Sequence, residues 1–275
     1  MKRKGSVSKV VYYVVMIALS FFMVLPLFWM ITTSLKDSGA LTAIPIEWIP
    51  KKVTLDSFRK LFEIFPFGKA FLNSVIVSVS ITIVNVFSAC MAAYVFAKIP
   101  FNGRELLFGI FLITMMIPGS VTLIPNYLIL RSFHLLNSYL GLVLPSFFNI
   151  FGIFMLRQSM RQIPDDFIDA AVIDGASQWK IFFNVIIPLS RPMIATLFVI
   201  TFMGAWNDYL WPLIVLTDKN KMTLPVALSM LNGQYSTEYN LLMAGALISI
   251  VPIIIVYAFA QRYFEEGLTA GGLKG

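Results

Sequence analysis

The chain has 275 residues, of which 58% are hydrophobic and 13% are charged, and its net charge is +7. Soluble domains carry about 45–50% apolar and 25% charged residues, so this composition excludes a soluble globular protein and indicates an integral membrane protein. No basic cluster with interleaved aromatic residues suggests nucleic-acid binding, and we therefore interpret the positive charge as a signal of membrane topology.

Six apolar stretches are long enough to cross a bilayer, because a spanning helix needs roughly 20 mostly apolar residues. They cover residues 10–33, 71–97, 106–123, 140–156, 189–213 and 241–260. The sequence therefore predicts an all-α, polytopic membrane protein with six transmembrane helices in a single domain, residues 1–275. The first stretch follows a basic start, as in a signal peptide. Its apolar run exceeds the roughly 7–15 residues of a signal core, so we expect an uncleaved span.

The distribution of Lys and Arg predicts the orientation in the membrane. Four of these residues lie within the first nine positions, and Lys98 and Arg104 follow the second span. Cytoplasmic loops carry the excess of positive charge, so we expect the N-terminus in the cytoplasm. An even number of spans then places the C-terminus there as well.

A polar segment at residues 157–188 separates the fourth and fifth spans. Pro164 and the two aspartates after it suit the first turn of a helix, and Gly175 suits a C-terminal cap. Ser177 can then cap a second helix, which gives a helix, a bend and a helix. Ala170 and Ala171 keep one face of the first helix flat, so a partner surface could approach closely. The alternative is an ordinary polar loop between two spans.

One ionisable residue, Asp208, falls within the fifth apolar stretch, next to Asn207. Charges at membrane depth are costly and normally face a bundle interior or a water-filled cavity, so Asp208 is a candidate residue of a translocation path. Asn207 could hydrogen-bond a hydroxyl group of a solute or a neighbouring helix. The competing interpretation is an interfacial belt formed by Trp206, Tyr209 and Trp211, with Asp208 at the water boundary.

The sequence offers little for enzymatic chemistry. His134 is the only histidine and Cys90 the only cysteine, which excludes a two-histidine zinc site and a disulfide within the chain. A phosphate-binding loop of the form G-x-x-x-x-G-K-[ST] is missing. We therefore expect no enzymatic activity, no metal and no cofactor in this chain.

The polar segment resembles the EAA signature of permease subunits in ATP-binding-cassette importers. The positions that match or adjoin this signature are Asp169, Ala170, Ala171, Asp174, Gly175 and Pro188. Asp stands where the signature has Glu, which keeps the charge. The resemblance implies that residues 157–188 couple the membrane domain to an ATPase.

Further matching pieces extend the resemblance over nearly the whole chain. They are PLFWMITTSLKD, NSVIVS, MMIPGSVTLIPNYLIL, IPDDFIDAAVIDGA, WNDYLWPL and QRYFEEGLTAGGLKG. The chain thus resembles the smaller permease of maltose-type transporters, in the carbohydrate-uptake branch of these importers. The resemblance implies a bacterial or archaeal cell membrane, a second permease, two ATPase subunits that hold ATP and Mg²⁺, an extracytoplasmic solute-binding protein, and a sugar or oligosaccharide substrate.

Two further hypotheses concern coupling. The small residues Gly267, Gly271 and Gly272 suggest a pliable C-terminal tail that reaches between the two ATPases and senses their closure. An ion-coupled secondary carrier is the alternative function, but it would need several buried charges, and Asp208 is the only candidate.

Overall fold

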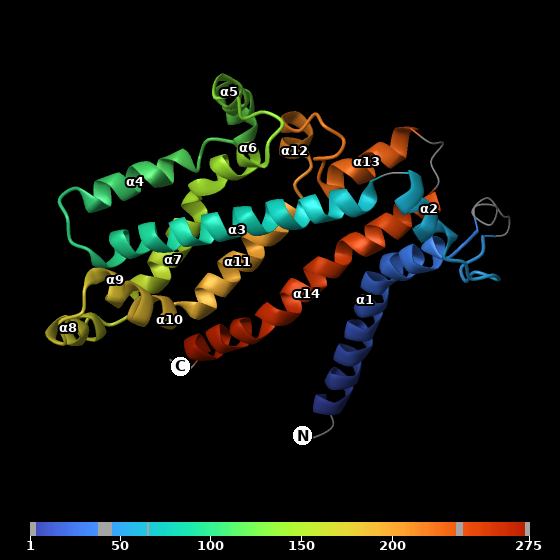
Figure 1. The fold of residues 1–275 in the computed structure, drawn as a ribbon. Coiled ribbons are helices and arrows are strands. Elements are labelled where there is room, and N and C mark those ends of the chain that lie inside the picture. The colour runs from blue at the N-terminus through green and yellow to red at the C-terminus, as the bar shows by residue number, and fades with distance from the viewer. Residues whose placement is uncertain (1–3, 38–45, 65, 235–238, 273–275) are drawn as a thin grey trace. The chain divides into compact units, whose positions relative to one another are not determined.

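The computed structural model describes residues 4–37, 46–64, 66–234 and 239–272, and within these ranges every regular element is helical. Three helices are long and apolar enough to cross a bilayer without a break (Figure 1). They are α1 (Lys4–Ser34), α3 (Phe67–Lys98) and α14 (Tyr239–Gly272). These helices confirm the first, second and sixth predicted spans.

The other three predicted spans are bent, and six spans result only when each bent pair is taken as one span. Helices α4 (Arg104–Thr114) and α5 (Gly119–Ser132) meet at 96°. Pro118 lies at the break, in the position directly before α5. Because proline has no N–H to donate to the carbonyls of a preceding helix, it favours a break at this point. The expectation of one continuous helix over 106–123 therefore needs correction.

The fourth span is interrupted near its middle. Helix α6 (Tyr139–Val143) and the 3₁₀ turn η2 (Leu144–Phe147) are followed, after a bend of 43°, by α7 (Ile150–Arg161). Asn149 caps α7 by accepting a hydrogen bond from the amide of Gly152 at 3.0 Å. A capped helix start inside an apolar run leaves polar backbone at this depth, where it needs partners from the protein.

The fifth predicted span, 189–213, is two helices. Helix α11 (Arg191–Trp206) ends where Asn207 begins a short link, and α12 (Leu210–Val215) follows it. Before α11, the stretch Gln178–Leu189 is bent by 80° relative to α11. It comprises α9 (Gln178–Ile181), the π-helical turn η3 (Phe182–Ile186) and α10 (Ile187–Leu189), which contains Pro188.

Contacts divide the chain into two compact units. The first comprises residues 1–68 and 227–251, and the second comprises residues 69–226 and 252–275. The first unit includes α1, α2 (Asp56–Ile64) and most of α13 (Leu224–Gln234). It packs closely at Gly245, where a Cβ would lie 2.5 Å from a methyl carbon of Leu228, so any larger residue there would force the Leu228 side chain to move.

The core of the second unit lies where α3, α7 and α11 pack together. Small residues allow this approach: Ala89 and Ala93 of α3 are fully buried, and a Cβ on Gly152 would lie 3.0 Å from the Leu197 methyl groups. Leu156 and Met160 of α7 belong to the same buried cluster and are themselves inaccessible to solvent. The functional segments described below are attached to this rigid core.

Candidate functional site

Helix α8 (Asp166–Ile173) and the turn after it form the first part of the candidate site. Figure 1 shows α8 projecting beyond the ends of α3 and α7. Gly175 has φ +74°, and its amide donates to the Val172 carbonyl at 3.0 Å, while the Ala176 amide donates to the Ala171 carbonyl at 2.9 Å. This pair of hydrogen bonds is a Schellman cap. The predicted helix end at Gly175 is therefore confirmed.

The second predicted helix of the segment starts directly after Ser177, the residue that was predicted to cap it. The Ser177 hydroxyl accepts a hydrogen bond from the Lys180 amide at 3.4 Å, and α9 follows directly. The structure thus has the helix, bend and helix expected from the sequence, continued by η3 and α10 towards α11. We call residues 157–188 the coupling segment.

The outward side of α8 is apolar at its centre and acidic at its margins. Phe167 is 52% exposed and Ile173 is 85% exposed, and Ala170 lies between them on the exposed side. Asp169 and Asp174 are exposed as well. Solvent-exposed Phe and Ile side chains grouped on one short helix are typical of a protein interface.

Ala171 lies on the other side of the same helix. It is half-buried and packs, together with Ile168, against the core cluster of the second unit. The expectation of a flat face shared by Ala170 and Ala171 therefore needs correction: Ala170 is open to a partner, whereas Ala171 anchors α8 to its own chain. Residues 171 and 168 lie one helical turn apart, so they share a face.

Two buried cations hold the coupling segment against the membrane helices. The Lys98 ammonium at the end of α3 donates to the Ile163 carbonyl at 2.5 Å and to the Asp165 carboxylate at 2.6 Å. The Lys98 side chain is 5% exposed. This contact fixes the start of α8 to the last residue of α3.

Arg157 makes the second and more extensive attachment. Its Nε donates to the Phe96 carbonyl at 3.0 Å, and its Nη2 donates to a carboxylate oxygen of Glu105 at 2.5 Å. The guanidinium also lies over the Phe108 ring, 3.8 Å from its centroid. Arg157 therefore joins α7 to the end of α3 and the start of α4; its hydrogen bond to the Phe96 carbonyl is buried, which strengthens it, whereas the Glu105 carboxylate is exposed.

An aromatic contact attaches the second helix of the coupling segment. The Tyr94 hydroxyl donates to the Gln178 side-chain oxygen at 2.6 Å. Tyr94 also contacts the Phe182 ring, with centroids 5.4 Å apart. Together with Lys98 and Arg157, this contact makes the coupling segment an extension of α3, α4 and α7.

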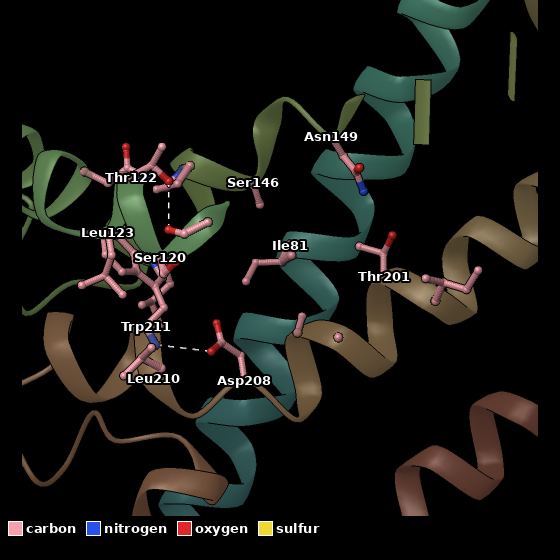
Figure 2. Close-up of a pocket in the computed structure, with 17 residues that line it drawn as sticks. Ile81, Ser120, Thr122, Leu123, Ser146, Asn149, Thr201, Asp208, Leu210 and Trp211 are labelled. Atoms are coloured by element: carbon pink, nitrogen blue, oxygen red, sulfur yellow. Dashed lines mark hydrogen bonds between the residues drawn. The ribbon is translucent and has the colours of Figure 1, made fainter. Parts of the chain in front are cut away.

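The second part of the site is a cavity of about 640 Å³ inside the second unit. Residues of α3, α5, α11 and α12 line it, as do residues around the break between η2 and α7 (Figure 2). The polar side chains of the lining are Ser120, Thr122, Asn126, Ser146, Asn149, Thr201 and Asp208. Hydroxyl and amide groups of this kind both donate and accept hydrogen bonds.

Asp208 is the only ionisable residue in this lining. Figure 2 shows its carboxylate directed into the cavity, where it accepts a hydrogen bond from the Trp211 amide at 3.3 Å. Asn207 does not line the cavity; its side chain donates to the Met203 carbonyl at 2.9 Å and so caps α11. The two residues predicted as one pair are therefore separated, and Asp208 alone faces the cavity.

A buried polar network supports the break in the fourth span beside this cavity. Asn85 of α3 is its centre: its amide donates to the Ser146 carbonyl at 3.0 Å. Its side-chain oxygen accepts from the Asn149 amide at 3.2 Å and from the Thr201 hydroxyl at 3.4 Å. Asn85 thus connects α3, α7 and α11 at the point where backbone groups would otherwise be unpaired.

Sequence reasoning missed Lys98, Arg157 and Asn85 as functional residues. Polar or charged side chains at the ends of apolar runs or inside them were the available signal, but their partners lie 52 to 116 positions away in the chain. The predicted tail also differs from expectation. Helix α14 continues to Gly272, so Gly267, Gly271 and Gly272 are helical, and residues 273–275 lie outside the described ranges. No cluster of three potential metal ligands occurs among the described residues.

Comparisons with known proteins connect these features to a family. Residues 85–270 match the family described as binding-protein-dependent transport system inner membrane component. The chain is 34% identical over 273 residues to the arabinooligosaccharides transport system permease protein AraQ of Bacillus subtilis, covering 98% of this chain and 97% of AraQ. It is 32% identical over 251 residues to the sn-glycerol-3-phosphate transport system permease protein UgpE of Shigella flexneri, covering 88% and 89%.

A solved structure has the same fold. It belongs to a bacterial ABC transporter involved in the import of the acidic polysaccharide alginate. The superposition has a TM-score of 0.85 at 24% identity, and it covers 96% of this chain and 99% of the other. This likeness establishes a shared arrangement of helices.

Proposed function

The chain belongs to the family of binding-protein-dependent transport system inner membrane components, and on that basis we propose that it is the sugar-translocating permease of an ATP-driven importer. It is a multi-pass protein of the cell membrane, and the ATPase activity of such systems lies on separate subunits. We propose that two ATPase subunits hold ATP and Mg²⁺, and that a second permease and an extracytoplasmic solute-binding protein complete the transporter.

The coupling segment is the observation that supports this proposal most directly. A short helix with exposed Phe167, Ala170 and Ile173 offers a partner an apolar surface. The Schellman cap at Gly175 and the Ser177 cap give that surface a defined shape. An ATPase groove that binds α8 would therefore hold a segment of fixed conformation, which is needed if movement of the ATPase is to be transmitted to the permease.

Movement of α8 would reach the membrane helices through the buried cations. When the ATPases close, α8 moves with them as a rigid body. Lys98 and Arg157 bind the coupling segment to the ends of α3 and α4, so these helices follow. The helices on either side of the cavity then rock relative to one another, and access to it alternates between the two faces of the membrane.

We further propose that the cavity forms this chain's wall of the translocation path. Its hydroxyl and amide groups suit the hydroxyl groups of a sugar, and Asp208 lies among them. The relatives named above transport arabinooligosaccharides in one case and sn-glycerol 3-phosphate in the other. Membership of the family therefore leaves the charge of the substrate open.

The orientation completes the proposal. Both termini and the coupling segment face the cytoplasm, where ATP is available, as the positive charges at the N-terminus and after α3 favour. The C-terminal end of α14, with Gly267, Gly271 and Gly272, then lies on the ATPase side and is placed to regulate closure.

The proposal is tested by reconstitution of the complete transporter in lipid vesicles. ATP is enclosed with the ATPase subunits, the loaded solute-binding protein is added outside, and uptake of labelled sugar is measured. We expect uptake that requires ATP hydrolysis and the binding protein. Uptake driven by a proton or sodium gradient without ATP would instead establish the secondary-carrier alternative.

A further inference from the structure

The cavity lining has one acidic residue and no basic residue, and this affects which charged substrates it can bind. Of the 17 residues that line the cavity, Asp208 alone is ionisable, and none is Lys, Arg or His. No ion pair joins Asp208 to any cationic residue that the structure describes. The carboxylate is stabilised by hydrogen bonding to the Trp211 amide, a group that offsets only part of a full charge.

We propose that Asp208 makes the cavity reject anionic solutes, so that the chain passes uncharged sugars and excludes uronates and sugar phosphates. This inference rests on the proposed function of the cavity as a translocation path, and it assigns the substrate class which the family leaves open. A uronate or phosphate needs cationic or multiple N–H donors for its charge, and this wall supplies neither Arg nor Lys.

The size of the effect follows from Coulomb's law. Two unit charges about 6 Å apart, at an effective dielectric constant of about 20, repel one another enough to lower occupancy roughly a hundredfold. An uncharged sugar escapes this penalty and can donate a hydroxyl hydrogen bond to the same carboxylate. The remaining lining groups, Ser120, Thr122, Asn126 and Thr201 among them, can pair with further hydroxyls.

The first test measures the electrostatic potential of the cavity without any assumption about the substrate. A cysteine is placed at Ser120 in the assembled transporter, with the native Cys90 changed to alanine. Its reaction rates with the cationic trimethylammonium-ethyl and the anionic sulfonato-ethyl methanethiosulfonates are compared, each normalised to free cysteine. We expect the cationic reagent to react faster, and Asp208→Asn to lower the ratio roughly fivefold or more.

A matched reporter controls for general effects of the substitution. Ser132 is exposed near the end of α5 and does not line the cavity, so a cysteine there should show the same ratio before and after Asp208→Asn. The inference is overturned if the ratio of cationic to anionic reaction rates at position 120 is unchanged by Asp208→Asn, or if neither reagent reacts there.

The second test uses sugars of matched size in the reconstituted transporter. We expect uptake of uncharged oligosaccharides and none of uronate-containing ones; import of a uronate oligosaccharide by the unaltered transporter overturns the inference. If no sugar is imported while the reagent ratio still depends on Asp208, the proposed function fails and the rejection of anions by the cavity stands. The two failures are therefore distinguishable.

Discussion

Replacement of Gly175 tests whether the shape of the coupling segment governs binding to the ATPase. Gly175 has φ +74°, and a Cβ built on it meets no atom within 4 Å. Substitution by alanine therefore introduces backbone strain without a steric clash. The left-handed conformation costs an L-residue about 1–2 kcal/mol; asparagine tolerates it better, whereas the β-branched valine tolerates it worst.

This strain can be converted into an expected change in affinity. If only the capped conformation binds the ATPase, the apparent affinity falls with the population of that conformation. A cost of about 1–2 kcal/mol corresponds to a decrease of up to about five- to thirtyfold. We expect the order Gly, Asn, Ala, Val from tightest to weakest, measured by titration of ATPase subunits onto the permease pair in lipid nanodiscs.

The chain contains a matched control for this experiment. Gly103 has φ +82°, and a Cβ on it would also meet no atom within 4 Å, but it lies in the turn before α4, outside the coupling segment. Gly103→Ala should therefore lower thermal stability about as much as Gly175→Ala while leaving ATPase affinity unchanged. Equal losses of affinity in both variants, or none in either, would refute the reasoning.

Three further predictions test individual contacts. Ala170→Trp should abolish ATPase binding at an unchanged melting temperature, whereas Ala171→Trp should overpack the core and destabilise the protein by about 1–3 kcal/mol; the reverse pattern would assign the two faces of α8 the other way round. Arg157→Met loses its hydrogen bonds to the ends of α3 and α4 and should cost about 1–3 kcal/mol in thermal denaturation, with exposed Arg161→Met as the control; equal effects would show that the buried attachment is unimportant. Asn85→Leu leaves polar groups at the break before α7 without partners, which should lower the stability of the protein by about 1–3 kcal/mol and reduce sugar uptake by the assembled transporter. Uptake at the unaltered rate would contradict this role of Asn85.

The coupling segment was predictable because its caps are local. Gly175 and Ser177 determine helix ends through hydrogen bonds to residues three to five positions away, and the residue types that suit such positions are few. Hydropathy likewise located the apolar stretches, since a bilayer imposes a minimum length on any helix that crosses it.

The breaks and the attachments could not be predicted in the same way. Pro118 interrupts the third stretch, yet a proline inside a transmembrane helix often produces only a kink. The bonds of Arg157 to Glu105 and of Asn85 to Asn149 join residues more than 50 positions apart. The orientation of Ala171 depends on which face of α8 the core occupies, and a helix of eight residues carries too little periodicity to decide that.

The π-helical turn η3 sets the rotational phase between the coupling segment and the membrane. An α-helix advances about 100° per residue, and a π turn accommodates one additional residue within its circumference. Deletion of a single residue between Phe182 and Ile186 would therefore leave an ordinary α-helical turn and keep α8 in nearly the same orientation. Deletion of a second residue could not be absorbed in this way and would rotate everything before it by about 100° about the local helix axis, which would turn the exposed side of α8 away from any groove that it fits. The extra residue in η3 thus gives the stretch from Ser177 to Arg191 a tolerance of one residue in length, and a larger change in length would misdirect the whole coupling segment.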